Sequence, residues 1–265
     1  MGLVVVLPAV FLIAVFMTMA GRGGGNFYVL LQVLAGASMH EAASTGQLIM
    51  FFTAFSALIV FQKHKGVAWR LAVFLGLTTS ATAFFGGYFA REFGGMALKL
   101  VFGSLLVAAS LLMFFPVSER AAPASRSALW TMGQWSFDVQ GQTAHVNLWV
   151  ATPFALATGF FSGMVGVSGG SFLVPLMVLA CRVPMKVAVG TASVLVSATA
   201  AMGFLGHAVS GSVDWSWALP QVPLAVVGGL IGGKLALATK PTALKKLFAT
   251  TTLIAAAFMF WNAFA

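Results

Sequence analysis

Charge is the scarcest property of this 265-residue sequence, because 14 Lys and Arg and 5 Asp and Glu make up only 7% of it. Apolar residues make up 60%, and the mean hydropathy is +1.00. A soluble domain carries about 25% charged residues, so this chain cannot keep a soluble surface hydrated. The shortage excludes a soluble enzyme, a disordered chain and a secreted disulfide scaffold. It predicts an all-α polytopic membrane protein embedded in a lipid bilayer.

Residues that would support metal, nucleotide or disulfide chemistry are also lacking. The single cysteine, Cys181, can form no internal disulfide and no Cys-ligated metal site. The sequence contains neither the HExxH zinc pattern nor the GxxxxGK[ST] phosphate loop. We therefore expect no metal, no cofactor, no ATP binding and no catalytic residues. The net charge of +9 comes from thinly spread cations without interleaved aromatics, so we expect no nucleic-acid partner.

A repeat runs through the sequence, because Trp69 and Trp215 stand in similar surroundings 146 positions apart. The same offset matches Thr45 with Thr191 and Gly86-Gly87 with Gly232-Gly233, and a gap of one residue upstream brings Gly24-Gly25 onto Gly169-Gly170. Matches at one offset predict two homologous halves. The expected organisation is a first membrane repeat at 1–116, a linker at 117–147 and a second membrane repeat at 148–265.

Each half contains five apolar segments, and the second of each five is too short for a bilayer crossing, which takes about 20 helical residues. The segments are 3–20, 26–37, 41–62, 67–90 and 96–116 in the first half, and 149–166, 171–181, 186–208, 214–238 and 243–263 in the second. A glycine-rich stretch precedes each short segment. We therefore expect a broken short helix in each half, which either crosses with the help of extended residues or re-enters.

Loop charge distinguishes these two topologies. If the short segments cross, 11 of the 14 cations lie on one side of the membrane, whereas re-entry divides them eight against five. Because cytoplasmic loops carry the excess of Lys and Arg, the first arrangement is favoured. Five spans is an odd number, so the second half enters from the opposite face and forms an inverted-topology repeat. We expect a multi-pass protein of the inner (cytoplasmic) membrane with the linker in the cytoplasm.

The two glycine-rich stretches and the helices after them supply the candidate binding residues. Glycine lets a backbone approach a ligand closely, and the free N–H groups at a helix start favour an anion. The candidate substrate-binding residues are Gly24, Gly25, Asn26, Thr45, Gln47, Gly169, Gly170, Ser171, Gly190, Thr191 and Ser193. Small residues with Ser and Thr also pack ordinary membrane helices, and for each motif alone that interpretation remains open.

Three polar residues near the first motif, Arg22, His40 and Glu41, are candidates for gating or proton coupling. Glu41 has a simpler interpretation, since an acidic residue favours a helix N-terminus. Lys234 lies within a span, where it either has a function or extends its ammonium group to the interface. His207 stands near the end of a span and is interpreted as interfacial.

The second-half motif resembles the signature of the sulfite exporter TauE/SafE family, whose members are also described as probable membrane transporter proteins. The residues that match are Gly169, Gly170, Pro175, Gly190, Thr191 and Ser193. The first half departs, with Leu30 at the proline position and Arg22 beside the glycines. The resemblance implies a secondary transporter, exporter or uniporter, of sulfite, organosulfonates or related small anions, and not an enzyme. The alternative is a non-transport intramembrane protein, either an assembly subunit or a membrane enzyme.

Overall fold

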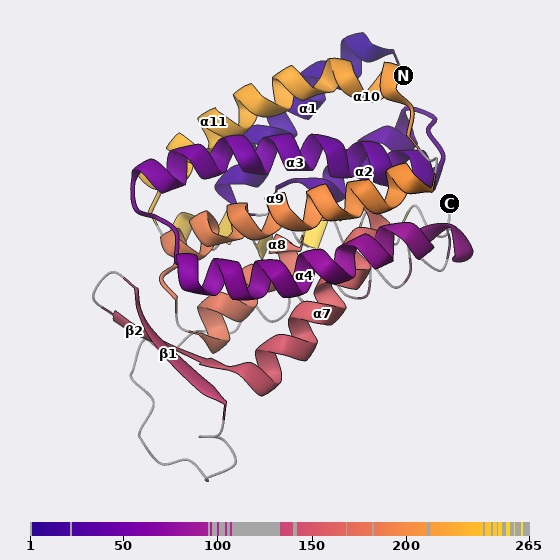
Figure 1. The fold of residues 1–265 in the computed structure, drawn as a ribbon. Helices are drawn as coiled ribbons and strands as arrows, with labels where there is room; N and C mark the ends of the chain where they lie inside the picture. The colour runs from indigo at the N-terminus through magenta and orange to yellow at the C-terminus, as the bar shows by residue number, and fades with distance from the viewer. Residues whose placement is uncertain are drawn as a thin grey trace.

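The fold is given by a computed structural model (Figure 1). It describes residues 2–21, 23–94, 133–139, 142–167, 169–181, 183–210 and 213–240, together with single residues and short runs at 96, 100, 104, 107 and between 242 and 261. Arg22, the first part of the linker, and most of the predicted segments 96–116 and 243–263 lie outside the described residues.

The described chain is helical apart from one hairpin, as the sequence predicts. The first half contains α1 (Leu3–Met19), α2 (Gly25–Leu34), α3 (Met39–Lys63), α4 (Trp69–Phe89) and a 3-10 turn (Ala90–Glu92). The second half contains α7 (Leu148–Val165), α8 (Gly170–Pro175), a π-helical turn (Leu176–Ala180), α9 (Met185–Val209), α10 (Trp215–Ala218), a 3-10 turn (Leu219–Gln221) and α11 (Val222–Ala238). The short second helix of each half is confirmed.

Within the described ranges, five helical stretches are long and apolar enough to cross a membrane: α3, α4, α7, α9 and the continuous stretch Trp215–Ala238. Their outward faces carry exposed apolar side chains such as Leu77, Trp149 and Val209. A lipid environment accommodates such a surface, and an α-helix satisfies its own backbone hydrogen bonds there. These features make the chain a multi-pass membrane protein.

Local side chains determine where two of the helices begin. The Ser38 hydroxyl accepts the Glu41 N–H (3.3 Å), and the Glu41 carboxylate accepts the Ser38 N–H (2.9 Å), which forms a capping box before α3. Asp214 caps α10 by accepting hydrogen bonds from the Ser216 hydroxyl (2.7 Å) and from the Trp217 N–H (3.2 Å). These hydrogen bonds lower the pKa of the exposed Asp214 carboxyl.

The end of the linker contains an antiparallel hairpin that the sequence interpretation missed. It consists of β1 (Gln134–Val139) and β2 (Gln142–Asn147). Trp135 packs edge-on against Phe74 of α4, with ring centroids 5.9 Å apart, so the hairpin contacts the helical bundle. Alternating apolar residues along β1 are the signal that would have predicted a strand.

The two halves exchange helices in their packing (Figure 1). Helix α4 packs mainly against α9 and α7, whereas α11 packs mainly against α3 and α1. At the repeat offset, α9 corresponds to α3 and α7 corresponds to α1, so these contacts are equivalent. Helices α3 and α9 also pack against each other. The result is an interlocked bundle in which each half contributes to the core of the other.

Equivalent glycines bring these helices close together. A Cβ at Gly86 of α4 would collide with the carbonyl of Phe160 in α7. A Cβ at Gly232 of α11 would lie 2.5 Å from the carbonyl oxygen of Val15 in α1. Because Val15 corresponds to Phe160 once the one-residue gap is included, the same close approach occurs twice. Small residues allow such backbone contact between membrane helices.

Helices α3 and α9 run antiparallel. Gly190, near the start of α9, packs against Phe61 near the end of α3. Gly203, near the end of α9, packs against Gln47 near the start of α3. The two most buried membrane helices therefore cross the bundle in opposite directions.

Helix α11 runs parallel to both α1 and α3. Its glycines contact the two helices in the same order along the chain: Gly228 with Ala14, Gly232 with Thr18, Gly229 with Thr53, and Gly233 with Val60. Helices α1 and α3 therefore point in the same direction. Only α2 and the two connections beside it lie between them in the sequence. The chain must return through the thickness of the bundle between them.

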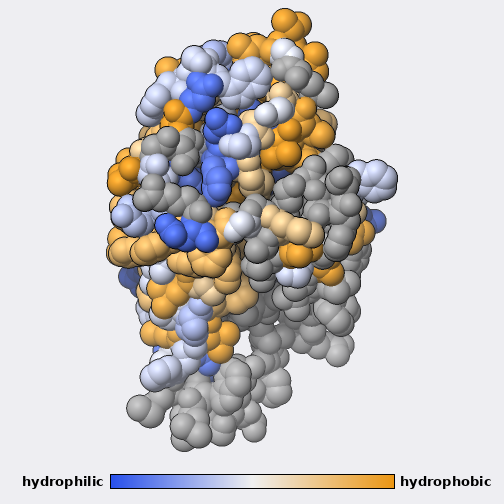
Figure 2. All heavy atoms as spheres, turned by 90° about the vertical axis from the view of Figure 1, so that its right-hand side faces the viewer, coloured by the Kyte–Doolittle hydropathy of each residue, from blue (hydrophilic) through white to orange (hydrophobic). Residues whose placement is uncertain are grey.

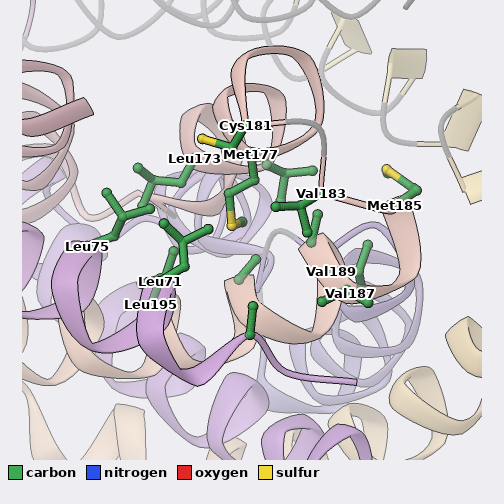
Figure 3. Packing of buried hydrophobic residues seen from close by; sticks show 14 of the residues in the cluster. Leu71, Leu75, Leu173, Met177, Cys181, Val183, Met185, Val187, Val189 and Leu195 are labelled. Carbon is green, nitrogen blue, oxygen red and sulfur yellow. The ribbon is translucent and has the colours of Figure 1, made fainter. Parts of the chain in front are cut away.

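A buried apolar cluster holds the broken second-half helix in place (Figure 3). Leu71 and Leu75 of α4, Leu173 of α8 and Leu195 of α9 are each fully buried in it. Cys181, just after the π-helical turn, is 2% exposed in the same cluster. Van der Waals packing of this kind drives helix association where no water is present. The cluster therefore positions α8 against α4 and α9.

Candidate functional site

The break between α1 and α2 is a turn of left-handed glycines: Gly21 (φ 72°), Gly23 (φ 66°) and Gly24 (φ 84°). Gly23 lies between α3 and α9, because a Cβ there would sit 3.1 Å from the Met50 side chain and would collide with Val196. Met50 and Val196 are equivalent residues near the middle of α3 and α9. The turn needs glycine for its conformation and for this close approach. It therefore lies at mid-depth in the bundle.

The start of α2 carries a buried amide without a partner. Gly24 caps the helix, and Asn26 in its first turn is 3% exposed. Neither Oδ1 nor Nδ2 of Asn26 has a hydrogen-bond partner within the described part of the chain. Burying an unpaired polar group costs about 1–3 kcal/mol. Such a group beside a helix N-terminus suits a ligand that accepts hydrogen bonds.

Gln47 connects the two halves. It is 1% exposed, and its Nε2 donates to the carbonyl of Ser162 (3.0 Å) and more weakly to that of Gly163 (3.4 Å). The Nε2 of His207 also donates to the Gly163 carbonyl, at 3.0 Å. His207 is 1% exposed, so it lies inside the bundle rather than on its surface. Both side chains donate hydrogen bonds to carbonyl oxygens in the last turn of α7.

The second-half break mirrors the first in its contacts. Gly166 has a φ of 78°, and a Cβ there would lie 2.5 Å from the Cα of Ala43, whereas a Cβ at Gly21 would lie 3.0 Å from the Cα of Val189. Ala43 and Val189 are equivalent residues of α3 and α9. Gly169, Gly170 and Ser171 are buried where α8 begins. Helix α8 has only six residues and continues directly into the π-helical turn.

Gly190 and Thr191 contact the connection between α3 and α4. Thr191 Oγ1 accepts the Ala68 N–H at 2.9 Å, and a Cβ at Gly190 would collide with the Gly66 carbonyl. Both residues therefore support the start of α4, a packing role that the sequence interpretation had kept open. Thr45, at the equivalent position in α3, is 1% exposed.

A narrow crevice lies where the end of α1 meets α3 and α9. Its lining residues are Thr18, Gly21, Gly23, Ala54, Ala57 and Ser193. Of these, Ser193 is a predicted binding residue, whereas Thr18 was missed by the sequence interpretation. The only sequence signal for Thr18 was a hydroxyl residue just before the glycine stretch. The structure thus brings Ser193 together with the first-half break, while Gln47 lies beside the end of α7.

The charged candidates lie at the start of α3. Glu41 is exposed, and its carboxylate accepts hydrogen bonds from both the backbone and the hydroxyl of Ser38. His40 is partly exposed. Figure 2 views the end of the bundle where α3 begins, and hydrophilic side chains gather there between apolar surfaces. Arg22 is outside the described residues.

The donors at these sites are neutral. Asn26 and Thr18 offer an amide and a hydroxyl, and the glycine turn offers backbone N–H groups. Across the residues that the structure describes, no three His, Cys, Asp or Glu side chains are grouped closely enough to hold a metal ion. The described residues of this arrangement can give several hydrogen bonds to a small oxyanion without a fixed counter-charge among them.

Several proteins are similar to this chain along most of its length. A probable membrane transporter protein of Xylella fastidiosa (strain 9a5c) is 29% identical over 92% of this chain and 89% of its own length. The probable membrane transporter protein YunE of Bacillus subtilis (strain 168) is 26% identical over 81% of each. No solved structure matches the chain.

The family model described as sulfite exporter TauE/SafE matches residues 6–259. This match includes both glycine breaks and all the membrane helices described above. The resemblance inferred from the second-half motif is thereby confirmed. The chain is a membrane transporter and belongs to the sulfite exporter TauE/SafE family.

Proposed function

We propose that this transporter carries sulfite, organosulfonates or related small anions across the inner membrane as a secondary transporter, exporter or uniporter. The observation that carries the proposal is the unpaired, buried amide of Asn26 at the start of α2. It lies two residues after Gly24, the last glycine of a left-handed turn at mid-depth in the bundle. Its surroundings offer hydrogen-bond donors to a ligand that must leave its water behind.

Neutral donors suit a transporter because the ligand must be released as well as bound. Each hydrogen bond contributes a net of about 0.5–1.5 kcal/mol, so several together bind an oxyanion without holding it permanently. An anion leaving a cell that is negative inside moves downhill by about 2.3 kcal/mol per charge per 100 mV. Export on this scheme requires no coupling ion.

The proposed transporter is an inverted-topology repeat of 1–116 and 148–265 joined by a cytoplasmic linker. The antiparallel course of α3 and α9 supports the inversion, since these are equivalent helices. The parallel course of α1 and α3 supports a short second segment that crosses rather than re-enters. Transporters with this architecture bind substrate where broken helices meet the middle of the membrane.

Transport by the purified protein in liposomes tests the proposal, with radiolabelled sulfite, thiosulfate, sulfate and a small sulfonate as substrates. Asn26→Leu removes the unpaired amide and is expected to lower uptake of the preferred anion about tenfold, the effect of losing one to two hydrogen bonds. Gln62→Leu makes the same chemical change at an exposed position of α3 and should leave uptake unchanged. Uptake of none of these anions by the unmodified protein would refute the proposal.

A further inference from the structure

The crevice at the end of α1 has a pseudo-symmetric counterpart that is filled. At the repeat offset, Thr18, Ala57 and Ser193 of the crevice correspond to Gly163, Gly203 and Gln47. On that side the Gln47 side chain occupies the space, with its Nε2 3.0 Å from the Ser162 carbonyl. Gly203 leaves room for it, because a Cβ there would lie 2.7 Å from that Nε2. The first-half crevice has the short Ser193 instead, and nothing equivalent to the Gln47 amide.

Thr18 behaves differently from other hydroxyl residues of the helices. Thr53 and Thr199 donate to the carbonyls of Ile49 (2.9 Å) and Leu195 (2.7 Å), one helical turn earlier. Thr18 is 3% exposed, lines the crevice, and its Oγ1 has no partner in the described ranges. A buried hydroxyl that does not use its own helix remains available to a ligand in the crevice.

We propose that the crevice between Thr18 and Ser193 is the specificity-determining contact for the transported anion, and that Gln47 permanently plugs the equivalent place in the other half. The inference rests on the proposed function and makes the two repeats unequal. The anion accepts hydrogen bonds from the Thr18 hydroxyl and from the N–H groups of Gly23 and Gly24. Ser193 lines the opposite side of the crevice, where its hydroxyl donates to the Val189 carbonyl (3.3 Å) and must turn away from that carbonyl to reach the anion. Because the crevice is too narrow for a water molecule in this structure, binding requires the end of α1 to move away from α9.

Equilibrium binding of radiolabelled sulfite to the purified protein, in oxygen-free buffer, tests this inference. Thr18→Val keeps the shape and removes the hydroxyl, so we expect three- to tenfold weaker binding, about the effect of one hydrogen bond. Its melting temperature should not fall, because the hydroxyl bonds to no described residue. Thr18→Ser should restore binding to within about twofold of the unmodified protein. Thr78→Val, which alters a part-buried threonine of α4 with bonds inside its own helix, should bind normally.

A second variant introduces a glutamine side chain into the crevice, as Gln47 provides in the other half. Ser193→Gln combined with Ala57→Gly reproduces the Gln47 and Gly203 pair on the crevice side, and we expect it to abolish sulfite binding while the protein remains folded by size-exclusion chromatography. Normal binding by Thr18→Val or by the double variant, in a protein that transports sulfite, would overturn the inference and leave the proposed function intact. If the unmodified protein neither binds nor transports sulfite or the other anions, both fail.

Discussion

The side-chain amide of Gln47 in α3 donates a hydrogen bond to the carbonyl oxygen of Ser162 in α7, 3.0 Å away. The two residues belong to different halves and stand 115 positions apart. The acceptor lies in the last turn of α7 and also accepts the Val167 N–H (3.0 Å) from the start of the break. This bond therefore holds the second-half break against the central helix of the first half.

Removing this bridge should destabilise the protein. Gln47→Ala deletes the donor and leaves a cavity beside Gly203, so we expect the free energy of unfolding to fall by about 1–3 kcal/mol. Thermal unfolding in detergent measures the effect. Gln62→Ala is the matched control, since Gln62 is exposed in the same helix. Equal stability of the two variants would show that the Gln47 bond contributes nothing.

The close contacts of Gly86 and Gly232 predict that neither position tolerates a side chain. Alanine at either place meets backbone of the opposite half, and overpacking of this kind costs about 1–3 kcal/mol. We expect a lower melting temperature and a smaller yield of monodisperse protein for Gly86→Ala and Gly232→Ala. Gly94→Ala serves as control because a Cβ at Gly94 has no atom within 4 Å. A normal melting temperature for both variants would contradict the packing.

Thr191 should prove structural rather than a ligand donor. Thr191→Val removes the acceptor of the Ala68 N–H and leaves that buried group unpaired, at a cost of about 1–3 kcal/mol. Thr191→Ser keeps the oxygen and should retain the stability. The fraction of Thr191→Val that remains folded is expected to bind sulfite normally. Loss of binding without loss of stability would instead make Thr191 part of the anion site, as the sequence pattern suggested.

Glu41 is expected to act as a helix cap and not as a proton carrier. Glu41→Gln preserves the capping box, because glutamine accepts the same hydrogen bond from the Ser38 N–H. Its rate of anion transport and the dependence of that rate on pH should match those of the unmodified protein. Ser38→Ala should lower the free energy of unfolding by about 1 kcal/mol. If Glu41→Gln alone abolishes the pH dependence of transport, Glu41 carries protons.

The inverted topology makes a prediction for the two loops that flank the fifth segment of the first half. Cysteines at Gly94 and Gln134, introduced singly with Cys181→Ala, should lie on opposite sides of the membrane. A membrane-impermeant maleimide should label Gly94→Cys in intact cells and Gln134→Cys only after permeabilisation. Cys181 is buried, so its replacement removes background with little change at the surface. Labelling of Gln134→Cys from outside would refute the cytoplasmic linker.

Much of the fold could be predicted because its determinants are local. A run of apolar residues long enough for the bilayer predicts a helix. The expected segments 41–62 and 186–208 correspond to α3 (Met39–Lys63) and α9 (Met185–Val209). Capping residues such as Ser38 and glycine breaks such as Gly23–Gly25 act over a few positions. The repeat offset follows from the amino-acid sequence alone, so the equivalence of Trp69 and Trp215 could be recognised without any knowledge of contacts.

The composition of the site depended on contacts between residues far apart in the chain. Nothing near Thr191 indicates that its hydroxyl receives the Ala68 N–H, and nothing near Thr18 indicates that its hydroxyl has no partner among the described residues. The exchange of α4 and α11 between the halves places Gly86 on α7 and Gly232 on α1. The sequence shows that a glycine permits close approach of a neighbouring helix. Which helix approaches it is decided by the packing of the whole bundle.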